Sequence, residues 1–180
     1  MGEKELRGAV YSAFKNRAMM YYHIFDELRK EVGEKKAAEI MKRGIYNRGV
    51  EIGKQLLAKY GPDDLEGLKN AFLGLDPDEG RMFSAEVLRS DAEGVDIRFH
   101  RCPLREAWQE AGLSDEETAK ICAIAARVDN GTFEGAGFEF SADTWKAEQG
   151  NCCYLHLRPG KRKKKPEESK PIKSERRGSK

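Results

Sequence analysis

The sequence predicts an α+β fold in which N-terminal helices pack on one face of a small antiparallel sheet. Apolar residues recur every three or four positions between Leu6 and Leu75, which is the spacing of an amphipathic helix. Several short segments of the second half alternate apolar and polar residues instead, as half-buried strands do. Helices and strands also come in blocks, with a helical pair inserted between two pairs of strands, which is typical of α+β proteins.

The N-terminal half is predicted to contain three helices. The first covers residues 3–32, the second covers 34–60, and Asp63 is expected to cap a short third helix. Within the second helix lie three glycines, Gly44, Gly49 and Gly53. A glycine in a helix interior costs about 1 kcal/mol relative to alanine. The glycines therefore indicate either a break near Gly44 or a close backbone contact with a neighbour.

The second half is predicted to contain four strands and the helical pair. The strands are expected over residues 82–89, 95–100, 137–140 and 152–157. Pro103 suits the first turn of one helix, and Ser114 with Glu117 forms a capping box for the next. The sequence Asp-Asn-Gly at 129–131 is a turn signal that is expected to end this second helix.

Charge is distributed unevenly along the chain. Residues 161–180 hold ten Lys and Arg against three Glu, a net charge of +7, so the remaining residues carry −5 of the total of +2. The basic segment has almost no aliphatic side chains to bury. The sequence therefore predicts a single α+β domain over 1–159 and a disordered basic tail over 160–180. Nucleic-acid binding beyond weak contacts of the tail is not favoured, because the domain is acidic.

No segment of the sequence indicates a membrane span or a signal peptide. No apolar run approaches the roughly 20 residues that a spanning helix needs, and the first residues are charged. We therefore expect a cytoplasmic protein whose four cysteines are thiols or metal ligands rather than disulfides. The sequence leaves the oligomeric state open, and a homo-oligomer is one of the alternatives.

The cysteines occupy different local settings. Cys122 lies among small apolar residues of a helix and Cys153 on the apolar face of a strand, so both are also typical of a protein core. Cys102 lies where a strand leads into a helix, next to His100 and Arg101. The partial positive charge of a helix N-terminus favours a thiolate, so Cys102 is predicted to be the most reactive thiol.

Short connections between the predicted elements bring four of these residues toward one place. The strand that ends near Cys102, the helix that contains Cys122, the turn at Asp129 and the strand with Cys153 are separated only by short loops. We therefore predict that the four residues converge on one site. The alternative is that Cys122 and Cys153 are separate core residues.

The order of these motifs resembles the L-2-amino-thiazoline-4-carboxylic acid hydrolase family. The resemblance covers residues 5–158 and rests on Cys102-Pro103-Leu104, on Cys122 followed by Asp129, and on the cysteine near the last strand. The last family motif resembles Gly-Asp-x-x-Cys, where this chain has Gly150-Asn151-Cys152-Cys153. The resemblance implies hydrolytic opening of a cyclic isothiourea such as 2-aminothiazoline-4-carboxylate.

Two catalytic schemes are compatible with this resemblance. In the first, Cys102 is the nucleophile and His100 or Asp129 transfers protons. In the second, zinc or another divalent metal activates water and is held by some of Cys102, Cys122, Cys153, His100 and Asp129.

The substrate implied by the resemblance is a small carboxylate. Arg98 or Arg101 is expected to bind the carboxylate in a bidentate way, and Trp108 is expected to contribute to the same binding site. A different class of function, a non-catalytic small-molecule-binding or sensor domain with a cysteine cluster, is the alternative.

Overall fold

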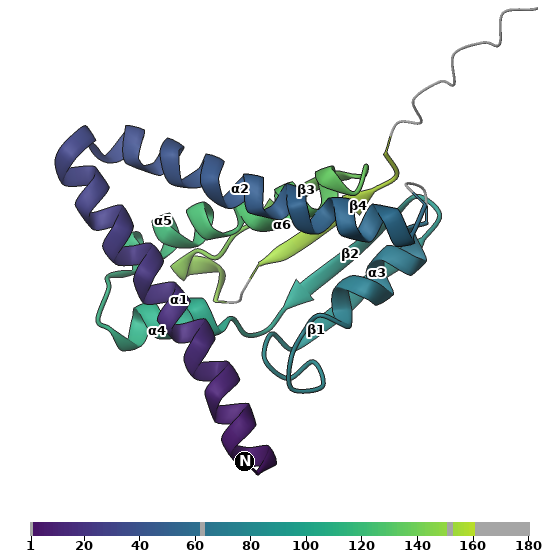
Figure 1. Cartoon of the computed structure of the whole chain (residues 1–180), viewed down its shortest axis with the longest axis horizontal. Coiled ribbons are helices and arrows are strands. Elements are labelled where there is room, and N and C mark those ends of the chain that lie inside the picture. Colours follow the sequence, from purple (N-terminus) through teal and green to yellow (C-terminus); the bar gives the residue numbers. More distant parts are fainter. Residues whose placement is uncertain (1, 62–63, 151–152, 161–180) are drawn as a thin grey trace, which may run out of the picture.

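Two long helices at the N-terminus form a V that spans the molecule (Figure 1). The computed structural model describes residues 2–61, 64–150 and 153–160. Helix α1 (Glu3–Val32) meets α2 (Glu34–Lys59) at Gly33, whose φ of 80° permits the sharp reversal. Helix α2 is continuous, so the predicted break near Gly44 is wrong.

A short helix, α3 (Leu65–Leu73), follows and leads toward the sheet. The Asp64 carboxylate accepts a hydrogen bond from the Gly67 amide at 2.8 Å and caps this helix. Asp63, the residue predicted as the cap, lies outside the described residues.

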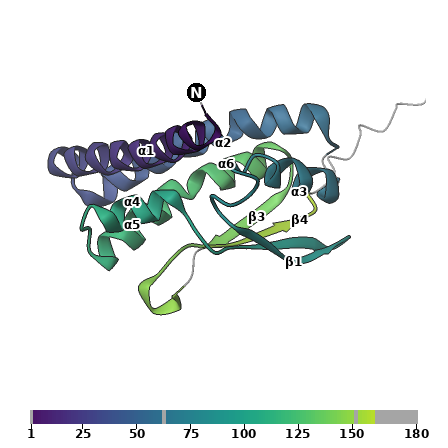
Figure 2. The same cartoon turned by 90° about the horizontal axis from the view of Figure 1, so that it is seen from below.

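The sheet has four antiparallel strands in the order β1-β2-β4-β3. They are β1 (Ala85–Asp91), β2 (Gly94–Phe99), β3 (Glu139–Asp143) and β4 (Tyr154–Arg158). The helices lie on one face of the sheet, which confirms the predicted α+β class (Figure 2). Met82, predicted to begin the first strand, lies instead in the turns before Ala85, and its side chain is buried.

Three helices, rather than the predicted pair, lie between β2 and β3. They are α4 (Pro103–Glu110), α5 (Asp115–Ala125) and α6 (Arg127–Gly135), and a 3-10 turn, η1 (Ala147–Gln149), precedes β4. The predicted turn at 129–131 is wrong, because Asp129, Asn130 and Gly131 belong to α6. Helical structure persists there because α6 packs closely against α2.

Glycines allow α2 and α6 to approach each other at backbone distance. A Cβ atom on Gly49 would overlap the Val128 carbonyl oxygen, and one on Gly53 would overlap the Thr132 carbonyl oxygen. A Cβ atom on Gly131 would likewise overlap a backbone carbonyl of α2. The predicted close backbone contact is thus confirmed for two of the three glycines, and it fixes the position of the helix that carries Asp129.

The buried side chains form two clusters. The first lies among α1, α2, α4 and α5 and includes Phe25 and Trp108, whose indole N–H donates a hydrogen bond to the Ala18 carbonyl at 2.8 Å. The second lies between the sheet and α3 and α6, with Phe133 at its centre. Cys102 packs against both clusters, so it lies at their junction.

The structure addresses the predictions about a membrane span and about the basic tail only in part. Among the described helices, none is long and apolar enough to cross a membrane. The predicted basic tail, apart from Gly160, lies outside the described residues.

Candidate functional site

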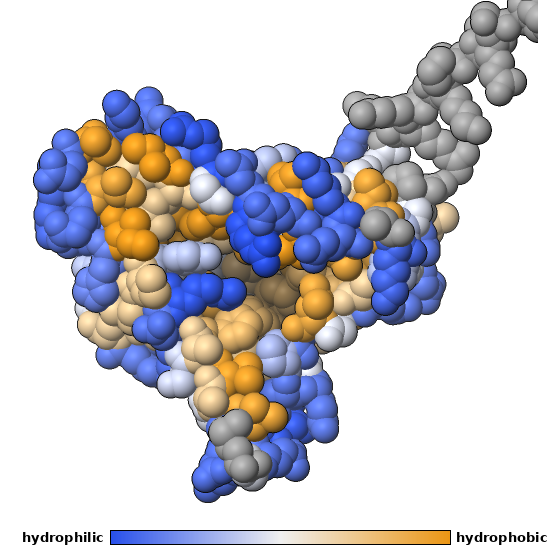
Figure 3. Space-filling model, viewed as in Figure 1, coloured by the Kyte–Doolittle hydropathy of each residue, from blue (hydrophilic) through white to orange (hydrophobic). Residues whose placement is uncertain are grey.

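A cavity of about 180 Å³ lies at the junction of the two core clusters. Its wall is largely apolar and includes Phe72, Phe83, Phe99, Leu104, Trp108 and Leu155. Figure 3 shows a hollow with hydrophobic walls near the centre of the face seen in Figure 1. A volume of this size suits a molecule of about ten non-hydrogen atoms.

Six side chains bring polar or ionisable groups to the cavity wall: Arg17, Asp76, Cys102, Cys122, Asp129 and Cys153. They come from α1, the turn after α3, the N-terminus of α4, α5, α6 and the residue before β4. The three cysteines and Asp129, which were predicted to converge on one site, therefore line the same cavity. Short loops bring the four residues together, as the sequence indicated.

Asp129 is the most perturbed acid of the site. It lies in the first turn of α6, and burial raises the pKa of its carboxyl to about 7, while the positive charge of Arg17 acts in the opposite direction. Asp129 is therefore divided between its protonated and ionised forms near neutral pH. A carboxyl in that state can both accept and donate a proton.

Cys102 caps the N-terminus of α4 with an extended backbone, at φ −152° and ψ 113°. Burial raises the pKa of its thiol, and the backbone N–H groups of Arg105 and Leu104 only partly oppose this effect. The prediction of a thiolate favoured by the helix N-terminus is wrong in its net direction, because desolvation outweighs the helix end. A base is therefore needed to ionise this thiol.

The other two thiols lie on the far sides of the cavity. Burial, together with the charge of Cys102, raises the pKa of Cys153 to about 11. The Cys153 carbonyl accepts a hydrogen bond from the Phe99 amide at 2.9 Å, which ties this residue to β2. Cys122 is buried within α5.

Three of the predicted site residues lie outside the cavity wall. His100 is exposed, and its Nε2 atom lies 2.8 Å from a Glu86 carboxylate oxygen. Arg101 forms an ion pair with Glu106 at 2.9 Å, and Arg98 packs over the ring of Tyr154. Of the residues predicted to bind substrate, Trp108 alone lines the cavity.

Arg17 and Asp76 were not predicted and are part of the wall. Arg17 lies three residues after Phe14 and four before Tyr21, so it interrupts the apolar stripe of α1. A charged residue at such a position is a signal in the sequence that could have identified it. Asp76 lies in a turn sequence that gives no such signal. Burial raises its pKa, and its carboxylate oxygens lie 3.3 Å from the Phe83 amide nitrogen, which donates to them.

The cysteines do not make a metal site within the parts of the chain that the structure describes. No group of three His, Cys, Asp or Glu side chains there is arranged to hold a metal ion. Cys102, Cys122 and Cys153 share a cavity, but they do not form the ligand set that the metal scheme requires.

The structure is thus an α+β domain with a small, largely apolar cavity whose wall contains an acid with a raised pKa and thiols. A model of the family described as L-2-amino-thiazoline-4-carboxylic acid hydrolase matches residues 13–157. The chain therefore belongs to this family, which supports a hydrolase-like role on a small molecule. No curated protein matches the chain.

Proposed function

We propose that this protein opens the ring of a cyclic isothiourea, 2-aminothiazoline-4-carboxylate or a close relative, by hydrolysis. Family membership supports this substrate class. The observation that carries the proposal is the presence of Asp129, with a pKa of about 7, on the same cavity wall as Cys102. Their charges interact, because the negative charge of Asp129 raises the pKa of the Cys102 thiol.

The first half of the reaction opens the ring. Asp129 accepts the thiol proton of Cys102, and the sulfur attacks the ring carbon that lies between the ring sulfur and two nitrogens. The electron pair of the carbon–nitrogen double bond moves to the ring nitrogen, which takes the proton from Asp129. The bond between the carbon and this nitrogen then breaks as the exocyclic amino group forms a double bond to the carbon, and the proton that the amino group gives up passes to the departing nitrogen, which leaves as an amine. The substrate is then bound to Cys102 as a ring-opened adduct that retains all of its atoms.

The second half releases the product. Asp129 accepts a proton from a water molecule, whose oxygen adds to the same carbon. Asp129 passes this proton to the imine nitrogen, which becomes an amino group again. The carbon–oxygen double bond then forms as the bond to the Cys102 sulfur breaks, and the hydroxyl proton passes through Asp129 to the sulfur. One water molecule is consumed, one ring carbon–nitrogen bond is broken, and a carbonyl is formed. The product is an S-thiocarbamate of cysteine with a free amino group.

The carboxyl of Asp129 is better suited than His100 to this proton transfer. A proton-transfer group must reach the reacting atoms, and His100 is exposed and held by Glu86 outside the cavity wall. A group whose pKa lies near the working pH also transfers protons in both directions most efficiently. Asp129 lies on the cavity wall with Cys102, and its pKa of about 7 is close to neutral pH.

The test is turnover of 2-aminothiazoline-4-carboxylate by the full chain, followed by mass spectrometry of the product. Asp129→Asn and Cys102→Ser should each lower kcat by about a hundredfold or more, which is the usual loss of a proton-transfer group or nucleophile. Asp115→Asn is the matched control, because Asp115 is an exposed acid of the neighbouring helix α5. Wild-type turnover in both site variants would refute the assignment. Tight binding of the ring compound without turnover by the parent protein would favour the non-catalytic binding domain.

A further inference from the structure

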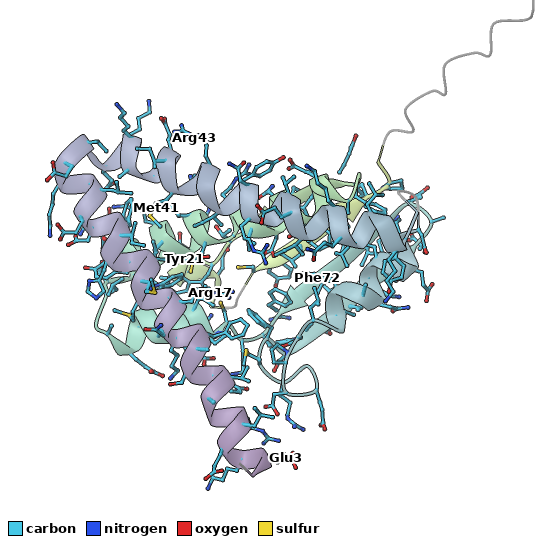
Figure 4. The ribbon with its side chains drawn as sticks, in the orientation of Figure 1. Glu3, Arg17, Tyr21, Met41, Arg43 and Phe72 are labelled. Carbon is cyan, nitrogen blue, oxygen red and sulfur yellow. The ribbon has the colours of Figure 1, made fainter. Side chains whose placement is uncertain are left out.

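We infer that Arg17 binds the carboxylate of the substrate and thereby sets the preference of the site for acidic ring compounds. This inference rests on the proposed function, and it replaces Arg98 and Arg101 as the carboxylate-binding residues. Arg17 lines the cavity, whereas the other two arginines lie outside its wall. Figure 4 shows Arg17 on α1 and Phe72 on α3, on opposite sides of the central hollow.

Arg17 makes no ion pair within the described residues, although it lies in a highly charged chain. Its guanidinium carbon lies 4.4 Å from the centroid of the Phe14 ring, and its charge interacts with that of Asp129. Two other arginines of the domain are paired with acids: Arg29 with Glu117 at 2.7 Å and Arg101 with Glu106 at 2.9 Å. The guanidinium donors of Arg17 are therefore available to a ligand in the cavity.

The aromatic contact makes Arg17 a ready partner for a carboxylate. A guanidinium group that lies over an aromatic ring is held flat, and its N–H donors at the edge remain open. A planar carboxylate can accept two parallel hydrogen bonds from that edge. Binding then requires little further ordering of the side chain.

Arg17 and Asp129 carry charges opposite to those of the two ends of the substrate, and both line the cavity. Arg17 is exposed at the mouth of the cavity, while Asp129 is surrounded by protein more closely. The carboxylate would bind at the mouth, and the amino-substituted ring carbon would lie deeper, near Asp129 and Cys102. The positive isothiourea end is attracted to an ionised Asp129, so both charges of the substrate are matched.

Asp76 is the other acid of the cavity wall, and it does not occupy the guanidinium group of Arg17 in place of a ligand. Its carboxylate accepts the Phe83 amide hydrogen bond, and its raised pKa, which is due mainly to burial, reduces its negative charge. No ion pair between Asp76 and Arg17 is present in the described structure. The guanidinium group of Arg17 is thus free of Asp76 and can pair with the carboxylate of a bound ligand.

The kinetic test compares two substrates that differ only in the carboxylate, 2-aminothiazoline-4-carboxylate and 2-amino-2-thiazoline. Arg17→Gln should raise the KM for the acid about tenfold to a hundredfold and leave the KM for the compound without a carboxylate unchanged. Arg17→Lys, which keeps the charge, should restore part of this loss. The assay belongs in alkaline buffer, where Asp129 is ionised in every variant, because loss of the Arg17 charge also raises the pKa of Asp129.

Arg127→Gln is the matched control. Arg127 also lies over an aromatic ring, that of Tyr46 at 5.3 Å, and it is not part of the cavity wall. In Arg127→Gln the ratio of the KM values for the two substrates should be the same as in the wild type. The same loss in Arg98→Gln or Arg101→Gln, with Arg17→Gln unaffected, would overturn the inference.

A binding measurement separates this inference from the proposed reaction. Calorimetry with thiazolidine-4-carboxylate and with thiazolidine needs no turnover. The wild type should bind the acid more tightly, and Arg17→Gln should remove that preference, even if the parent protein hydrolyses neither substrate. Equal affinity of the wild type for the two rings would overturn the role of Arg17, whether or not hydrolysis is observed.

Discussion

Replacement of Asp129 by asparagine should make the protein more stable, and increasingly so as the pH rises. The folded protein holds the Asp129 proton up to a pKa of about 7, whereas an ordinary carboxyl loses it near 3.8. Between these two values the folded state binds more protons than the unfolded state does. Its free energy of unfolding therefore falls as the pH rises through this range.

The size of the effect follows from the same two pKa values. Each factor of ten in a protonation equilibrium corresponds to about 1.4 kcal/mol, so the difference between 3.8 and about 7 amounts to about 4 kcal/mol. Because the side chain keeps some contact with solvent, about 2 to 4 kcal/mol is the expected gain of Asp129→Asn above pH 7. Below pH 4 the gain should vanish.

The assay is urea unfolding of the wild type and the variant at a series of pH values from about 4 to about 9. Asp115→Asn serves as the control, because Asp115 is exposed. Its effect should be small throughout this range. A stability difference between wild type and Asp129→Asn that does not change with pH would refute the claim that burial raises this pKa.

Two further predictions concern the helix contact and the thiols. Gly49→Ala should lower the free energy of unfolding by about 1 to 3 kcal/mol, because the added methyl overlaps the Val128 carbonyl. Gly44 has open space around it, so Gly44→Ala should raise the free energy of unfolding by up to about 1 kcal/mol. Equal effects of the two variants in denaturant unfolding would contradict the close contact between α2 and α6. Cys102 and Cys153 should react with iodoacetamide at neutral pH more slowly than in the urea-unfolded chain, because burial raises both pKa values. Site-resolved mass spectrometry measures these rates, and alkylation of Cys102 at its unfolded rate would show that the thiol is not desolvated.

The helices and strands were largely predictable because local patterns determine them. The apolar stripe of α1 and the alternation in β2 follow directly from periodicity. Helix α6 was not predictable in the same way, since its Asp-Asn-Gly sequence favours a turn when it is considered alone. Gly131 becomes helical because it packs against the backbone of α2, and that contact exists only in the folded chain.

The members of the site were more predictable than their chemistry. Topology brought Cys102, Cys122, Asp129 and Cys153 together, and this followed from the order of the elements. Their pKa values depend on how much protein surrounds each group, which the sequence does not contain. For this reason the helix N-terminus suggested a lowered pKa for Cys102, while burial in the fold raises it.

The location of the arginines illustrates the same limit. Arg98 and Arg101 are neighbours of the reactive cysteine in sequence, yet their side chains are engaged with Tyr154 and Glu106 outside the cavity. Arg17, distant in sequence, reaches the wall because α1 crosses the domain. Sequence proximity to a cysteine was therefore a poor guide to which arginine lines the cavity.

The central claim is that Cys102 attacks the ring carbon with the help of Asp129. It is tested most directly by stopping the reaction with 2-aminothiazoline-4-carboxylate by acid within the first turnovers and measuring the mass of the intact chain and its peptides. We predict a mass increase of one whole substrate molecule on the peptide that contains Cys102, absent in Cys102→Ser and strongly reduced in Asp129→Asn. Full turnover by Cys102→Ser, with no adduct on the wild type, would contradict the account.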